Sequence, residues 1–140
     1  MANINKKIYW DACIFLAWIY DEPKEPDVID GIEEMVRDVD NNRVKLITSI
    51  VTRTEILESR LNAEARDRFD KIFKRRNVVM INLDTRISDL SHDIRDFHYQ
   101  QGHVLSTPDS QHLATAIIHN VDIFYTLDGS EKKKKRESYR

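Results

Sequence analysis

Apolar residues along the chain fall into two patterns, short continuous runs and longer segments in which they recur every three or four positions. Short runs rich in branched and aromatic residues are typical of buried strands. They occur at Ile8–Trp10, from Val44 within Val44–Val51, at Val78–Leu83 and at Val121–Leu127. Segments with a helical repeat separate them, and these are Ala12–Tyr20, residues 28–39, a helix from about Thr52, residues 62–74, a helix capped by Asp84 or Thr85, and a helix from Thr107.

The order of these segments predicts the fold class. Strands alternate with helices, and the strand segments are mostly apolar throughout, which is typical of strands covered on both faces. We therefore expect a three-layer α/β/α domain with a parallel central sheet of about four to five strands. The single domain is expected to span residues 1–128, and residues 129–140 form a polar, lysine-rich tail.

Composition supports one globular domain and narrows the function classes. The chain has 140 residues, of which 41% are hydrophobic, enough for one domain with a real core. The net charge of −2 does not mark a nucleic-acid binder, although a local basic patch is not excluded by a sum. Cys13 is the only cysteine, so one chain cannot build a disulfide or a cysteine-based zinc site. No run is long enough to span a membrane, and we expect a cytoplasmic protein.

Four carboxylates are expected at one edge of the predicted sheet. The carboxyl ends of parallel strands share an edge, where open α/β sheets bind their ligands. Asp11 directly follows the first strand, and Glu55 lies in the first turn of the helix after the second. Asp109 lies in the first turn of the helix that leads into the fourth strand, and Asp128 directly follows that strand.

A cluster of this kind predicts a metal centre. Carboxylates packed together repel one another, so a fold tolerates them cheaply only with a cation between them. Oxygen donors without cysteine suit Mg²⁺ or Mn²⁺. Such an ion activates a bound water and neutralises a phosphodiester oxygen. The residues therefore point to metal-dependent hydrolysis of a phosphodiester, with one acid as general base.

Each acid also has a purely structural interpretation. Asp11 is a suitable N-cap, and Glu55 completes the capping-box pattern that starts at Thr52. Asp109 complements a helix dipole behind Thr107 as N-cap, and Asp128 begins a turn sequence. The metal interpretation is favoured because none of these roles requires all four acids to share one edge.

Four segments resemble the motif segments of PIN-domain nucleases, in the family's order. They are "IYWDACIFLAWI", "LITSIVTRTEIL", "TPDSQHLATAI" and "IFYTLD", and together they extend from Ile8 to Asp128. The Pro-Asp-x-x-His-Leu-Ala-Thr-Ala block is the most specific of them. The resemblance implies a Mg²⁺- or Mn²⁺-dependent endoribonuclease, as in VapC-type toxins of type II toxin–antitoxin pairs.

The resemblance also assigns residues and partners. It implies that Asp11, Glu55, Asp109 and Asp128 are metal ligands and that Thr126 is a supporting hydroxyl that orients water or Asp11. It implies an RNA substrate, a cognate antitoxin protein and a homodimer. His112 is not assigned to catalysis, and we expect a neutral histidine packed against the sheet.

Two questions stay open in the sequence. A non-catalytic PIN-like module that binds RNA or a protein is the alternative function, although the presence of all four acids favours the enzyme. The basic run Lys132–Arg136 is either a solvated tail or a phosphate contact beside the site. The chain also continues past Asp128 into polar residues where the family usually adds a short fifth strand.

Overall fold

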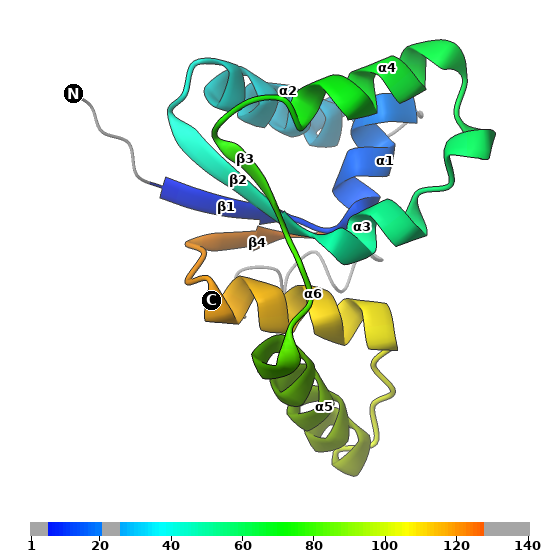
Figure 1. Ribbon diagram of the computed structural model, residues 1–140, viewed down its shortest axis with the longest axis vertical. Helices are drawn as coiled ribbons and strands as arrows, with labels where there is room; N and C mark the ends of the chain where they lie inside the picture. The colour runs from blue at the N-terminus through cyan, green and yellow to red at the C-terminus, as the bar shows by residue number, and fades with distance from the viewer. Residues whose placement is uncertain (1–5, 21–25, 128–140) are drawn as a thin grey trace.

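A four-stranded parallel sheet forms the middle layer of the computed structural model, which describes residues 6–20 and 26–127 (Figure 1). The strand order is β3-β2-β1-β4. The strands are β1 (Lys6–Trp10), β2 (Val44–Ser49), β3 (Val78–Ile81) and β4 (Ile123–Tyr125). This confirms the predicted α/β class. A fifth strand after Asp128 would lie outside the described residues.

Helices cover both faces of the sheet (Figure 1). One face carries α1 (Ala12–Tyr20), α2 (Pro26–Asp40) and α4 (Ala63–Ile72). The other carries α5 (Thr85–Gln100) and α6 (Thr107–Ile118). The short α3 (Ile50–Glu55) and the 3₁₀ turn η1 (Glu58–Arg60) extend from the carboxyl end of β2. None of the helices within the described ranges is long and apolar enough to cross a membrane.

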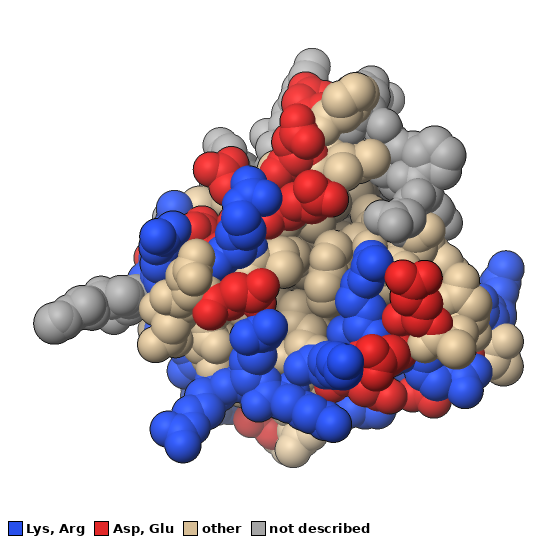
Figure 2. All heavy atoms as spheres, turned by 90° about the horizontal axis from the view of Figure 1, so that it is seen from above, with Lys and Arg blue, Asp and Glu red and all other residues tan. Residues whose placement is uncertain are grey.

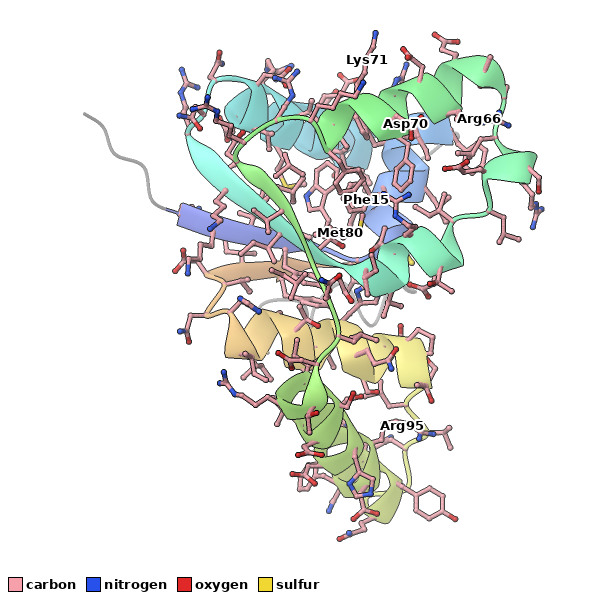
Figure 3. All side chains as sticks on the ribbon, viewed as in Figure 1. Phe15, Arg66, Asp70, Lys71, Met80 and Arg95 are labelled. Carbon is pink, nitrogen blue, oxygen red and sulfur yellow. The ribbon has the colours of Figure 1, made fainter. Side chains whose placement is uncertain are left out.

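The domain has one apolar core on each face of the sheet. Neighbouring residues of β1 point into different cores, because side chains alternate across a strand. Trp10 packs with Phe15 and the other apolar residues under α1, α2 and α4. Phe15 is fully buried, and Figure 3 shows it pointing from α1 towards the space under α4. Tyr9 faces the opposite side, where it packs with Leu113 and Phe124 under α6. Trp10 and Phe15 are thus core residues.

Three helices end in the same way, with a residue of positive φ whose own amide and the next amide both bond back to the last turn. Asn42 (φ 60°), Gly102 (φ 86°) and Asn120 (φ 55°) occupy this position after α2, α5 and α6. After α5, for example, the amide of His103 bonds to the carbonyl of His98 at 2.8 Å. This is the Schellman arrangement, which glycine and asparagine favour. Asparagine and glycine therefore suit these three positions.

The starts of two helices differ from prediction. The N-cap of α6 is Ser106, whose hydroxyl accepts from the amide of Asp109 at 3.2 Å, so Thr107 is already helical. Helix α3 begins at Ile50 behind the N-cap Ser49, and Glu55 is its last residue. The predicted capping box at Thr52 does not form, because the Thr52 hydroxyl is engaged by Thr48 of β2 at 2.7 Å.

Charged side chains cover the outer face of α2 and α4 (Figure 2). Lys71 of α4 points away from the sheet (Figure 3) and pairs with Asp67 at 3.0 Å. Arg75, just after α4, joins Asp40 at the end of α2 with an ion pair of 2.8 Å. Because these pairs are well exposed, they contribute little to stability.

The apolar side of α5 is buried only over part of its length. Ile87 is fully buried, whereas Phe97 is 59% exposed. On α6, Leu113 and Ala114 are buried, but Ile117 is 40% exposed. The two exposed residues line a small groove between α5 and α6 together with Ile94 and Leu113.

Candidate metal centre at the carboxyl edge of the sheet

Asp11 occupies the junction between β1 and α1. Its side chain is buried, with the residue 4% exposed, and Oδ1 accepts from the amide of Cys13 at 3.1 Å. Its own amide donates to the carbonyl of Tyr125 at 3.4 Å, which ties the end of β1 to β4. The carboxylate therefore caps α1, as its structural interpretation predicted, and also lies at the carboxyl edge of the sheet, as the metal interpretation requires.

Glu55 reaches the same part of the molecule from the end of α3. The atom Oε1 lies 2.8 Å from Nε2 of His112 on α6, while the Glu55 side chain stays 31% exposed. The predicted position in a first helical turn was wrong. Because α3 is so short, the end of this helix is still close to the end of β2.

Asp109 lies in the first turn of α6, as predicted, and is half-buried. Its amide is held by the cap Ser106. The N-terminus of a helix carries partial positive charge, which stabilises a carboxylate there. One helical turn separates Asp109 from His112, so α6 carries one predicted ligand and contacts a second, Glu55, through the imidazole.

Two buried threonines, Thr48 and Thr126, lie at the strand ends beneath these acids. The Thr48 hydroxyl donates to the carbonyl of Trp10 at 2.7 Å and also contacts Thr52 at 2.7 Å. Thr126 follows β4 and is 8% exposed. Trp10 pairs with Tyr125 in the register of β1 and β4, so continuing that register sets Thr126 beside Asp11. The supporting role predicted for Thr126 is consistent with this position.

His112 makes a contact with one of the predicted ligands that the sequence did not predict. It is 1% exposed, and its Nδ1 lies 2.7 Å from the hydroxyl of Tyr9 while its Nε2 faces Glu55. The expected packing against the sheet is confirmed, but the contact with Glu55 was not predicted. The one-turn spacing from Asp109 was a signal that His112 lies near the acids, but it did not identify Glu55 as the partner. Burial, followed by the nearby Asp11 carboxylate, raises the pKa of Tyr9 well above its ordinary value.

Three of the predicted ligands carry donor atoms of the kind that a divalent cation prefers. Asp11, Glu55 and Asp109 offer carboxylate oxygens, the donors that Mg²⁺ and Mn²⁺ prefer. They come from three chain segments that meet at the carboxyl edge. Within residues 6–20 and 26–127, no three acidic, histidine or cysteine side chains already form a group that could hold a metal. The fourth predicted ligand, Asp128, and the basic run Lys132–Arg136 lie outside the described residues.

Comparison with known proteins agrees with this geometry. Residues 8–136 match the family model described as PIN domain. No curated protein sequence matches the chain.

Solved structures share the fold at low sequence identity. VapBC2 from Rickettsia felis, bound to a DNA fragment from its promoter, is similar with a TM-score of 0.66 and 15% identity, over 91% of this chain and 92% of that one. VapC20 from Mycobacterium tuberculosis, a toxin that cleaves the sarcin–ricin loop, gives 0.65 and 14%, over 89% and 92%. A toxin–antitoxin complex from Klebsiella pneumoniae gives 0.57 and 16%, over 85% and 84%. At these identities the likeness establishes the fold alone.

Proposed function

Because the chain belongs to the PIN-domain family, we propose that it is a metal-dependent endoribonuclease that hydrolyses RNA phosphodiester bonds. The observation that carries this proposal is the position of its acids. Asp11 is buried where β1 ends, and Glu55 is hydrogen-bonded to the same helix that bears Asp109. An enzyme of this type needs carboxylates at that edge, whereas a fold with no catalytic role has no need to gather them there.

The proposed mechanism assigns a task to each residue. Asp11, Glu55, Asp109 and Asp128 would hold Mg²⁺ or Mn²⁺, and one of these carboxylates would take the proton of the attacking water. The chemistry that such an ion would supply is a lower pKa of the attacking water and neutralisation of charge on the phosphate. Thr126 orients Asp11 from the end of β4. The α6 N-terminus adds a favourable field for the anionic substrate.

Cleavage of RNA in the presence and absence of Mn²⁺ tests this proposal. The wild-type chain is expected to cut a structured RNA mixture with Mn²⁺ and to stop when the metal is chelated. Asp11→Asn and Asp109→Asn should each lower the rate by about 100-fold or more, because metal ligands supply most of the charge stabilisation. Asp93→Asn removes an exposed acid of α5 and serves as the matched control.

The same experiment separates the enzyme from the alternative function. A non-catalytic module would bind the RNA, or a protein partner, with no metal-dependent cleavage. Wild-type protein that binds RNA but leaves it intact with either metal, under conditions where it is folded, would favour that alternative.

We also propose that this chain is the toxin of a toxin–antitoxin pair and that the antitoxin docks beside α2. One similar structure is a toxin–antitoxin complex. In this chain, an open cavity of about 510 Å³ lies between α1, α2 and the end of β4. Its walls combine apolar residues with acids, which suits a segment with apolar and basic side chains. The lining includes Ile14, Val28, Ile32, Met35, Asp27, Glu34 and Asp38.

Gly31 provides a clean way to block that cavity. It lines the cavity, and a Cβ added at Gly31 would meet no atom within 4 Å. Gly31→Arg should therefore keep the fold and prevent binding of the protein co-expressed with this chain, while Gly31→Ala preserves binding. Equal binding by both variants would contradict this docking site.

The proposed homodimer would form through a surface other than the cavity beside α2. The aromatic residues of the first strand and helix, Trp10 and Phe15, are buried in the core. The groove between α5 and α6 instead exposes Phe97 and Ile117. Light scattering on the wild type and on Phe97→Glu tests this assembly. A dimer that Phe97→Glu converts to a monomer would support it, and a wild-type monomer at high concentration would refute it.

A further inference from the structure

A chain of hydrogen bonds links the interior of the domain to the acidic edge. It starts at the Tyr9 hydroxyl on β1, passes through the His112 imidazole on α6, and ends at Glu55 on α3. The two contacts are 2.7 and 2.8 Å long. Tyr9 and Glu55 are 46 positions apart in the sequence, so the connection arises only in the folded chain.

Packing holds Tyr9 and His112, the two buried residues of this hydrogen-bonded series, in fixed positions. Tyr9 is fully buried, and its ring stacks on Phe124 with centroids 5.1 Å apart and an interplanar angle of 9°. The imidazole of His112 meets the same tyrosine ring edge-on, at 5.7 Å and 76°. Because rotamer changes in a close-packed interior are costly, the imidazole presents a fixed edge to Glu55.

Chemistry then assigns the protons. An ionised carboxylate only accepts hydrogen bonds, so Nε2 of His112 must carry a proton towards Glu55. A neutral imidazole has one N–H, which leaves Nδ1 as an acceptor. The phenol of Tyr9 is an O–H donor at neutral pH and satisfies Nδ1. The contact between Nδ1 and the buried Tyr9 hydroxyl thus favours the Nε2–H form of the histidine.

We propose that His112, set in its Nε2–H tautomer by Tyr9, is a positioning residue that holds Oε1 of Glu55 so that the second oxygen can serve a divalent cation. This inference rests on the proposed function. It also gives a reason for the one-turn spacing of Asp109 and His112. Helix α6 supplies one ligand directly and orients another, so a single rigid element sets both.

Variants of His112 distinguish the contact that Nε2 makes with Glu55 from the contact that Nδ1 makes with Tyr9. In His112→Gln the amide nitrogen takes the place of Nε2 and keeps the donor to Glu55. In His112→Asn the side chain reaches only the place of Nδ1, so the contact with Tyr9 is kept and the donor to Glu55 is lost. Tyr9→Phe keeps the stacked ring and removes only the hydroxyl. Ser91→Ala is the matched control, since it deletes a different buried hydrogen bond, 2.6 Å to Ser110, on the α5 side.

Mn²⁺ affinity, measured by calorimetry on folded protein, is the first readout. Loss of a residue that orients a metal ligand typically weakens binding by about 10- to 100-fold, and this is the loss expected for His112→Asn. His112→Gln and Ser91→Ala should bind within about threefold of the wild type, and Tyr9→Phe should fall between the two groups. Wild-type affinity in His112→Asn, or an equal loss in His112→Gln, would overturn the positioning role.

The tautomer of His112 in the metal-free wild type is the second readout, and it needs no variant. Long-range ¹H–¹⁵N NMR should give an acceptor-type shift for Nδ1 and a protonated shift for Nε2. A proton on Nδ1 alone, or on both nitrogens, would overturn the role of Tyr9. If the wild type fails to bind Mn²⁺, both the proposed function and this inference are contradicted. If the wild type binds Mn²⁺ and cleaves RNA, and His112→Asn binds Mn²⁺ as tightly as the wild type, only this inference is contradicted.

Discussion

The hydroxyl of Thr48 on β2 donates a hydrogen bond of 2.7 Å to the carbonyl of Trp10 on β1. A side chain of β2 therefore fixes the carboxyl end of the adjacent strand. The next residue after Trp10 is Asp11. The placement of this acid therefore depends on a buried contact that is not itself part of the candidate metal centre.

Replacement of Thr48 should reveal that dependence. Thr48→Val keeps the shape of the side chain but leaves the buried Trp10 carbonyl without this donor, which should cost about 1–3 kcal/mol of unfolding free energy. Thr54→Val, at an exposed position of α3, should cost much less. Urea unfolding of both variants measures the difference. Equal stabilities would show that the Thr48 contact contributes nothing.

The corrected start of α6 leads to a second prediction. Ser106, rather than Thr107, caps the helix that carries Asp109. Ser106→Ala should lower the unfolding free energy by about 1 kcal/mol, the usual contribution of an N-cap. Thr107→Ala should have a smaller effect, because Thr107 is already within the helix. Thermal unfolding of the two single variants decides between the caps, and a larger loss in Thr107→Ala would restore the original assignment.

Two glycines should respond to alanine in opposite directions. Gly31 lies inside α2 with open space around it, so Gly31→Ala should stabilise the protein by about 0.5–1 kcal/mol. Gly102 has a φ of 86° after α5, where a side chain is strained, so Gly102→Ala should destabilise it by about 1 kcal/mol. Denaturation midpoints give both values, and the same sign for both would contradict this account.

His119 should make stability depend on pH. Burial, followed by the charge of Lys7, holds the pKa of His119 below its ordinary value of 6.5. The unfolded chain therefore takes up this proton at a higher pH than the folded chain does, so the contribution of His119 is full above about pH 6.5 and is lost as pH falls below it. Wild-type stability should fall more steeply from pH 7 to 5 than that of His119→Gln. Parallel curves would exclude this linkage.

The fold was largely predictable because its local signals agree with one another. Each strand overlaps a predicted apolar run, although β1 begins two residues earlier, at Lys6, and β4 is shorter than its run. Asp84 caps α5 as expected, accepting from the amide of Ile87 at 2.9 Å. The errors arose where a local pattern had two solutions. Ser49 and Thr52 are both residues that can cap a helix. In the folded chain Ser49 accepts from the amide of Val51, whereas the Thr52 hydroxyl contacts Thr48.

The candidate site was predictable to a different degree. Asp11 could be placed because it follows a strand, and Asp109 because it sits in a recognisable first turn. The pairing of Glu55 with His112 could not be read from the sequence, since 57 positions separate them and nothing local links them. The exposure of Phe97 was also hidden, because a helical repeat marks a face without showing how much of it the next layer covers.

Mn²⁺ calorimetry on the wild type and on Asp11→Asn combined with Asp109→Asn shows whether the acids at the carboxyl edge form a metal centre. Both proteins must first give the same folded circular-dichroism spectrum. Saturable Mn²⁺ binding is expected for the wild type, and none is expected for the double variant. A folded wild type that binds no Mn²⁺, or a double variant that binds it equally well, would contradict the metal mechanism.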